Sequence, residues 1–202
     1  MLHRIAYTLL LGCALLAWGT ASTAAQPGGP RFELNVDRVD GVDGGKVYQI
    51  TSNITVAATP AATWRVLTDY GHLASYLPNL KSARVVSRNG ERAIVEQLGT
   101  ARYLFFSQTI RVVVLVHERA PDRIDISLIE GDMKVYRASW ELRPLPGAAG
   151  TRIVYSATIE PKFDVPSIVG VGVVKKDIAK MMAALLLRLD RQDDAERRSI
   201  NQ

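Results

Sequence analysis

The sequence predicts an α+β fold in which a curved antiparallel sheet wraps around one long C-terminal helix, with two short helices after the first strand. Residues 82–159 alternate apolar and polar side chains between turn signals, which indicates consecutive strands. Residues 60–77 show short helical spacings that are interrupted at Gly71. Residues 166–189 carry apolar side chains at helical spacing, which predicts a long amphipathic helix.

The helix predicted over 166–189 needs an apolar surface to cover. At a rise of about 1.5 Å per residue it would be about 36 Å long, enough to cross a small sheet. One stripe of the helix collects most of its apolar side chains: Val171, Val174, Ile178, Met181, Met182, Leu185 and Leu189. Val169, Val173 and Leu187 project to the opposite side. We expect the stripe to close a core or a cavity against the sheet.

Strand signals fill the middle of the chain. Alternating patterns in 32–36 and 48–56, on either side of a glycine-rich turn, predict a hairpin. Six further strands are expected at 82–87, 92–98, 104–117, 124–129, 135–143 and 151–159. The short links between these strands indicate an antiparallel meander. Each strand has one apolar and one polar face, as a sheet that wraps around a single helix requires.

Two short helices are predicted between the hairpin and the meander, over about 60–69 and 72–77. Thr59 is expected to cap the first helix, and a proline at residue 60 suits its first position. Pro78 is expected to stop the second helix. We expect Asp69 to secure the turn between the two helices rather than to act in catalysis.

The N-terminus has the features of a signal peptide. Arg4 precedes an apolar run, and small residues follow it up to Ala25. The apolar run is too short to span a bilayer unaided. We therefore expect an exported protein, secreted or periplasmic. The chain then divides into a signal peptide at 1–25, a spacer with an extra hairpin strand at 26–45, the main domain at 46–192 and a polar tail at 193–202.

The amino-acid composition excludes several classes of functional site. The single cysteine, Cys13, lies in the expected signal peptide, so disulfides and thiol chemistry are excluded from the mature chain. The net charge of +5 comes from interspersed basic and acidic residues, which argues against nucleic acid as a partner. His72 and His117 are expected on polar surfaces, so no metal site is predicted. The candidate acid or base groups near a cavity are Gln97, Gln108, Glu130, Asp132, Tyr136 and Tyr155.

Short motifs in a fixed order add a family resemblance over roughly Val47 to Leu189. The motifs are Val56, Pro60, Trp64, Leu67 and Asp69-Tyr70, then Pro78, Glu118 with Pro121, Gly131-Asp132, Trp140, Gly150-Thr151 with Tyr155, and Pro161 with Pro166. In this order the chain resembles the helix-grip fold of START-like (SRPBCC) domains, and within them the polyketide cyclase/dehydrase and coenzyme-Q-binding START-domain family. The resemblance implies a hollow between sheet and C-terminal helix that holds an apolar small molecule. It implies no shared catalytic residues and no cofactor.

We therefore expect an exported protein that binds or carries a hydrophobic small molecule, such as a lipid, an isoprenoid quinone or a polyketide. The predicted cavity lining is Trp64, Gln108, Val112, Val114, Ile126, Trp140, Tyr155, Ile178, Met182 and Leu185. Val169 and Val173 are expected at the cavity mouth, where they would allow a transient membrane contact. A monomer is expected. The alternatives are a cyclase or dehydratase that acts on a polyketide-like or aromatic substrate, and a module that binds protein or RNA.

Overall fold

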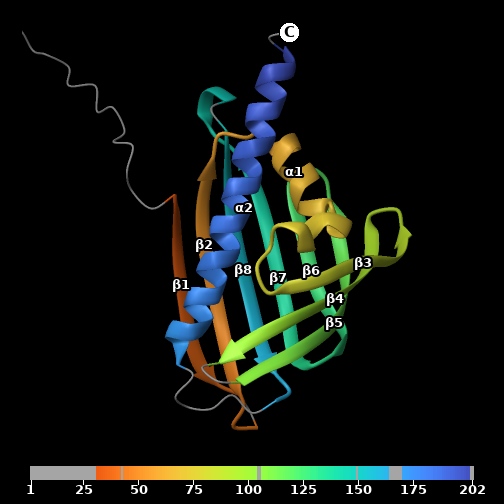
Figure 1. Ribbon diagram of the computed structural model, residues 1–202, viewed down its shortest axis with the longest axis vertical. Helices are drawn as coiled ribbons and strands as arrows, with labels where there is room; N and C mark the ends of the chain where they lie inside the picture. Colours follow the sequence, from red (N-terminus) through yellow and green to blue (C-terminus); the bar gives the residue numbers. More distant parts are fainter. Residues whose placement is uncertain (1–30, 42, 104–105, 149, 164–169, 201–202) are drawn as a thin grey trace, which may run out of the picture.

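The computed structural model describes residues 31–41, 43–103, 106–148, 150–163 and 170–200. The regular elements are β1 (Phe32–Asp40), β2 (Lys46–Val56), α1 (Pro60–Thr68), η1 (Tyr70–Ser75), β3 (Leu80–Asn89), β4 (Arg92–Tyr103), β5 (Phe106–Arg119), β6 (Arg123–Gly131), β7 (Met133–Pro144), η2 (Pro146–Ala148), β8 (Thr151–Pro161) and α2 (Val171–Ile200) (Figure 1). The expected signal peptide at 1–25 lies outside the described residues. No described helix combines the length and the apolar character needed to cross a membrane.

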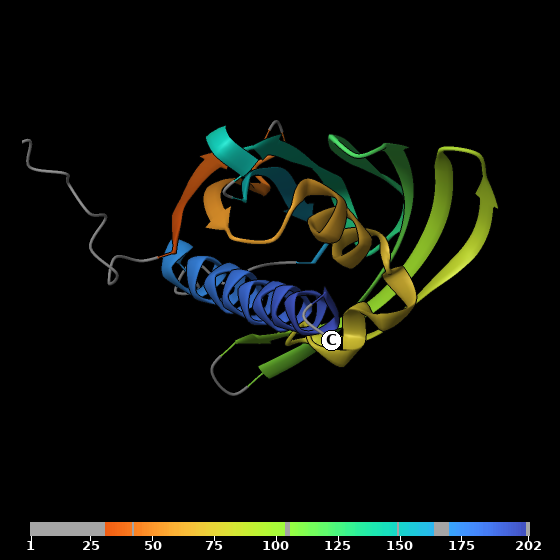
Figure 2. The ribbon, with the colours of Figure 1, turned by 90° about the horizontal axis from the view of Figure 1, so that it is seen from above.

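All eight strands form one antiparallel sheet in the order β1-β2-β8-β7-β6-β5-β4-β3. The meander predicted from residue 82 onward is confirmed as β3 to β8, and the predicted hairpin is confirmed as β1 and β2. β2 pairs with β8, which joins the hairpin to the last strand of the meander. Seen from above, the sheet curves around α1 and α2 (Figure 2). The predicted fold class, a curved antiparallel sheet around a long C-terminal helix, is therefore confirmed.

The sheet bends where one strand carries an extra residue relative to its neighbour. The pairing of β5 with β6 shifts next to Val113, and that of β7 with β8 shifts just after Met133. Such bulges increase the local twist and bending of a strand. Gly131, at the end of β6, has a φ of 128°, and a Cβ there would lie 2.2 Å from the Arg111 carbonyl oxygen. The glycine of this sequence motif thus allows two strands to approach closely at the bend.

Helix α1 begins as predicted, because the Thr59 hydroxyl accepts a hydrogen bond from the Ala62 N–H at 3.2 Å. The second short helix, η1, is a 3₁₀ helix that begins at Tyr70, two residues earlier than predicted. Between the two helices, the Asp69 carboxylate contacts the exposed His72 ring at 2.8 Å. Asp69 therefore lies at the turn, where the sequence places it.

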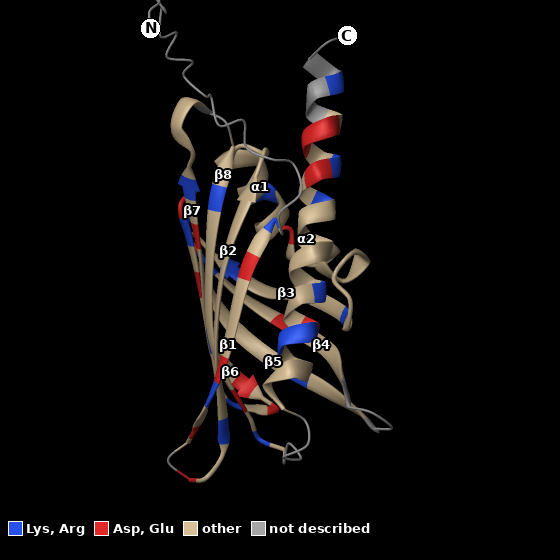
Figure 3. Ribbon diagram, turned by 90° about the vertical axis from the view of Figure 1, so that its left-hand side faces the viewer, with Lys and Arg blue, Asp and Glu red and all other residues tan. Residues whose placement is uncertain are grey.

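Helix α2 begins and ends later than predicted. It begins at Val171 rather than at residue 166, after the non-helical Gly170. It continues to Ile200, beyond the expected end at Leu189. The residues after 189 are mostly polar but include strong helix formers, so the helix continues beyond the last residue of its apolar stripe. The segment expected as a polar tail is therefore helical up to residue 200, and this end of α2 projects beyond the sheet (Figures 1 and 3).

Charged side chains of both signs are interspersed over the strands and α2 (Figure 3). One ion pair joins distant parts of the chain. The Arg31 guanidinium donates two hydrogen bonds to the Asp190 carboxylate, at 2.5 and 2.7 Å. This paired geometry is typical of arginine with a carboxylate. It ties α2 to the residue that precedes β1, next to the strand on which α2 packs.

The Gly150-Thr151 motif locks β8 to the connection between β2 and α1. Gly150 has a φ of 125°, and a Cβ there would lie 2.0 Å from the Val56 carbonyl oxygen. Only glycine fits this position without moving the backbone. Thr151 is fully buried, and its hydroxyl donates to the Ala58 carbonyl at 2.7 Å. The motif therefore has a structural role.

Candidate ligand-binding pocket

A cavity of about 340 Å³ lies among the inner face of the sheet, α2 and the segment from η1 to β3. Its volume is near the lower end of the roughly 300–1,000 Å³ that small-molecule sites occupy. Apolar side chains dominate its walls: Ile50, Leu67, Leu73, Leu77, Pro78, Leu80, Ala101, Ile110, Val112, Val116, Ile124, Ile126, Met133, Trp140, Ile159, Ile178, Met181 and Leu185. Of all the lining residues only Pro78 is exposed, so it marks the rim.

Six of the ten side chains predicted to line a cavity do line this one: Val112, Ile126, Trp140, Tyr155, Ile178 and Leu185. They come from four strands and from α2, which the fold brings together around one space. The alternating pattern of the strands and the helical stripe thus point to the same interior. Their contact with a ligand stays a prediction.

Two of the remaining four, Val114 and Met182, are fully buried in the core and do not face the cavity. The apolar stripe of α2 divides into two rows. The row of Ile178, Met181 and Leu185 faces the cavity, whereas Met182 belongs to the row that packs in the core. Because α2 packs against β1, β2 and α1, its apolar surface is wider than the cavity that it covers.

Trp64 and Gln108 are also absent from the cavity wall. Trp64 packs partly buried against the core, and Leu67 on the buried face of α1 reaches the cavity instead. Gln108 lies near the start of β5, where its amide donates to the Thr109 carbonyl at 3.0 Å. The cavity ends before this position, at Ile110 of the same strand.

Some of the polar residues predicted near a cavity line it and others do not. Gln97, Tyr136 and Tyr155 line the cavity. Glu130 and Asp132 do not, because both engage Arg111. The Arg111 guanidinium donates to Glu130 at 3.0 Å, and the Arg111 backbone N–H donates to Asp132 at 2.7 Å. These two carboxylates are therefore structural partners of a neighbouring strand.

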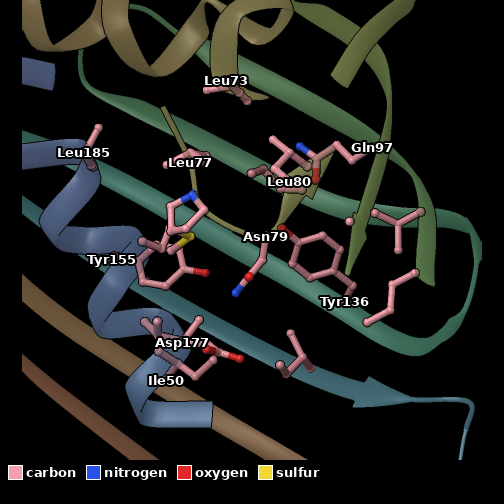
Figure 4. A pocket seen from close by; sticks show the side chains of 18 of the residues that line it. Ile50, Leu73, Leu77, Asn79, Leu80, Gln97, Tyr136, Tyr155, Asp177 and Leu185 are labelled. Carbon is pink, nitrogen blue, oxygen red and sulfur yellow. The ribbon is translucent and has the colours of Figure 1, made fainter. Parts of the chain in front are cut away.

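Two tyrosine hydroxyls point into the cavity from neighbouring strands. Tyr155 on β8 packs its ring against Trp140 on β7, with ring centroids 4.3 Å apart. Tyr136 lies on the same face of β7. The two hydroxyls point toward each other across the cavity (Figure 4). Burial raises the pKa of both hydroxyls, and the proximity of Tyr136 raises that of Tyr155 further.

Further polar groups come from segments that sequence reasoning did not select. The Asn79 side chain faces the cavity from the connection between η1 and β3, and Asp177 faces it from α2 (Figure 4). Asn79 has a φ of 69°, a left-handed conformation that asparagine tolerates better than most residues. Its carbonyl accepts a hydrogen bond from the Thr100 N–H at 2.8 Å. No periodic pattern marks such a residue in a sequence.

A buried polar cluster beside the cavity was also missed. Glu118 continues the inward-facing row of β5, and the residue is 8% exposed. It accepts a hydrogen bond from the Tyr70 hydroxyl at 2.8 Å and two from the Arg88 guanidinium at 2.8 and 3.0 Å. Tyr70 also lines the cavity. The cluster ties η1 to β3 and β5. A carboxylate at an inward position of an otherwise apolar strand was the sequence signal that could have predicted it.

The residues predicted at the cavity mouth lie only partly within the described part of the chain. Val169 lies outside the described residues, and Val173 is half-buried and is not part of the cavity wall. Leu187, on the side of α2 away from the stripe, is 58% exposed. Among the described residues, no group of three or more His, Cys, Asp or Glu side chains is placed to hold a metal ion.

Comparisons with known proteins agree with this architecture. No functionally curated protein matches the chain. A START superfamily protein from Mycobacterium smegmatis is 18% identical with a TM-score of 0.61, and the match covers 71% of this chain and 97% of that one. A STAR-related lipid transfer protein from Xanthomonas axonopodis is 16% identical with a TM-score of 0.58, covering 77% and 98%. The Zhui aromatase/cyclase from Streptomyces sp. R1128 is 17% identical with a TM-score of 0.52, covering 76% and 96%.

At these identities the structural neighbours show a shared fold, the START-like helix-grip fold. The sequence itself gives the family. A family profile described as polyketide cyclase / dehydrase and lipid transport matches residues 56–186, which is more than half of the chain. The matched range runs from the end of β2 to the row of α2 that faces the cavity. The chain therefore belongs to the polyketide cyclase / dehydrase and lipid transport family.

Proposed function

We propose that the protein is an exported carrier that holds a hydrophobic small molecule between its sheet and α2. The observation that carries this proposal is the mostly apolar cavity of about 340 Å³ inside the fold. Protein interiors are normally close-packed, since each void forfeits contacts and costs free energy. A cavity of this size is best explained as a binding site, and the fold and family fit a hydrophobic ligand.

The cavity also limits the class of ligand. A volume near the lower end of the range for small-molecule sites favours a ring system or a single chain over a two-chain lipid. Apolar burial would provide most of the affinity, at about 25 cal/mol for each Å² removed from water. An isoprenoid quinone head or a polyketide-like ring system would fit this description.

A cyclase or dehydratase acting on a polyketide-like substrate is the alternative function. The polar side chains Tyr136, Tyr155 and Asp177 in the cavity favour it. However, burial raises the pKa of both tyrosines, so they stay protonated near neutral pH and are poorly suited to act as bases. The carrier is therefore the first proposal. Turnover of a polyketide substrate by protein free of bound ligand would support the alternative instead.

Native mass spectrometry of the protein purified from its own host tests the carrier. We expect a co-purifying apolar molecule on the wild-type chain. Ile126→Trp places a larger side chain in the cavity wall and should abolish the bound species. Ile129→Trp is the matched control, because Ile129 lies on the same strand, is 50% exposed and is not part of the wall. Equal ligand occupancy in both variants would contradict the proposal.

Export and membrane contact belong to the same proposal. The signal-peptide features of residues 1–25 support a secreted or periplasmic location, which cell fractionation tests. Replacing Val169 and Val173 with Asp should abolish association with liposomes and leave the circular dichroism spectrum unchanged. Unaltered liposome binding would contradict a membrane contact at these residues.

A further inference from the structure

The cavity contains more hydrogen-bonding groups than an apolar ligand would need. The Tyr136 and Tyr155 hydroxyls point into the cavity (Figure 4), and among the described residues neither forms a hydrogen bond with another protein group. The Thr100 hydroxyl is buried and also lacks a partner. A buried polar group without a partner costs about 1–3 kcal/mol. The two tyrosine hydroxyls face the open space of the cavity, where they can donate hydrogen bonds to a bound molecule.

The two tyrosines are held in position for this purpose. Trp140 and Tyr155 are directly opposite each other on β7 and β8, and their rings contact at an angle of 40°. This cross-strand aromatic contact restrains the Tyr155 ring. In Figure 4 the hydroxyls of Tyr136 and Tyr155 point toward each other, and the side chain of Asn79 lies between them in this view. A ligand in this part of the cavity would face two O–H groups.

This part of the cavity offers several hydrogen-bond donors, beside the acceptor oxygens of Asn79 and Asp177. A neutral tyrosine hydroxyl donates one hydrogen bond, and the amide of Asn79 donates up to two. A carbonyl oxygen has two lone pairs and accepts from two donors at once. We propose that Tyr136 and Tyr155 bind a carbonyl oxygen, so that the ligand is an apolar molecule with a carbonyl group rather than a plain hydrocarbon chain. This inference rests on the proposed function, because it needs a ligand in the cavity.

A pair of probes of the same shape tests the inference. Fluorene and fluorenone share a flat tricyclic skeleton and differ by a carbonyl group in place of a methylene. Dissociation constants for both are measured by titration calorimetry on the wild type and on Tyr155→Phe. The quotient of the two constants, compared between proteins, cancels the difference in hydration of the probes. We expect Tyr155→Phe to weaken fluorenone binding about threefold to tenfold and to leave fluorene within about twofold.

Three further variants make the test specific. Tyr136→Phe should act like Tyr155→Phe. Asn79→Gly removes the amide while glycine keeps the left-handed backbone, and a smaller loss of fluorenone binding is expected. Tyr48→Phe is the control, because the Tyr48 hydroxyl is buried without a partner but is not part of the cavity wall. It should leave the quotient unchanged.

A spectroscopic measurement reports the hydrogen bond directly. The infrared carbonyl stretch of bound fluorenone should move to higher frequency in Tyr155→Phe than in the wild type, because a donor weakens the C=O bond. If both probes bind but the quotient and the stretch do not change in the tyrosine variants, the carbonyl inference is overturned and the carrier proposal stands. If neither probe binds the wild-type protein, both are overturned.

Discussion

The cluster of Tyr70, Glu118 and Arg88 makes a quantitative prediction about stability. The Tyr70 hydroxyl donates to a carboxylate that is almost fully buried, and Arg88 pairs with the same carboxylate from the solvent side. Tyr70→Phe removes one hydrogen bond and keeps the ring that lines the cavity. Glu118→Gln keeps an acceptor for Tyr70 and removes the negative charge that faces Arg88.

The expected magnitudes follow from burial. A hydrogen bond to a charged group contributes about 1.5–3 kcal/mol. The lower part of this range applies to Tyr70→Phe, because Glu118 keeps Arg88 as a partner, and we expect a loss of about 1.5–2 kcal/mol. For a domain of this size that lowers Tm by about 3–8 °C. The Arg88 side chain is 42% exposed, so solvent screens its charge and Glu118→Gln should cost only about 1 kcal/mol.

Urea unfolding of the wild type, both single variants and the double variant gives the coupling between Tyr70 and Glu118. We expect a coupling energy of about 1 kcal/mol with an unchanged m-value. Tyr48→Phe is the matched control, since the same substitution there removes a hydroxyl that has no partner. A coupling energy below about 0.3 kcal/mol, or equal losses for Tyr70→Phe and Tyr48→Phe, would refute the reasoning.

Four other substitutions have defined outcomes. Arg31 lowers the pKa of Asp190 below its usual 3.8, so the pair stabilises the fold above about pH 4 and the benefit is lost as the pH falls through the lowered pKa. Arg31→Gln should therefore reduce stability by up to about 1 kcal/mol at pH 7, and the difference from the wild type should vanish as the pH falls below the lowered pKa of Asp190. Gly150→Ala should cost more than about 3 kcal/mol, whereas Gly147→Ala, where a Cβ meets nothing within 4 Å, should cost about 1 kcal/mol by thermal unfolding. Tyr48→Phe should be neutral or stabilising in the same assay, because it removes a buried hydroxyl without a partner.

Local sequence patterns were enough to predict the strands, their order in the meander and their inward faces. The reason is that each strand is marked locally, by a period of two between turn residues. Thr59 as a helix cap is local in the same sense, since cap and partner lie three residues apart. The family motifs added the helix-grip fold to this prediction. The six predicted residues that line the cavity all lie on strongly periodic strands or on the α2 stripe.

Which of the buried residues face the cavity depends on the packing of the whole fold. Periodicity separates buried from exposed positions, but it does not distinguish a residue packed on neighbours, such as Met182, from one beside an open space, such as Met181. The link between Tyr70 and Glu118 spans 48 positions in the chain and depends on how far the sheet bends. Asn79 reaches the cavity because its backbone is held in a left-handed turn by β4. These contacts join segments that are distant in sequence, and only the packing of sheet and helices brings them together.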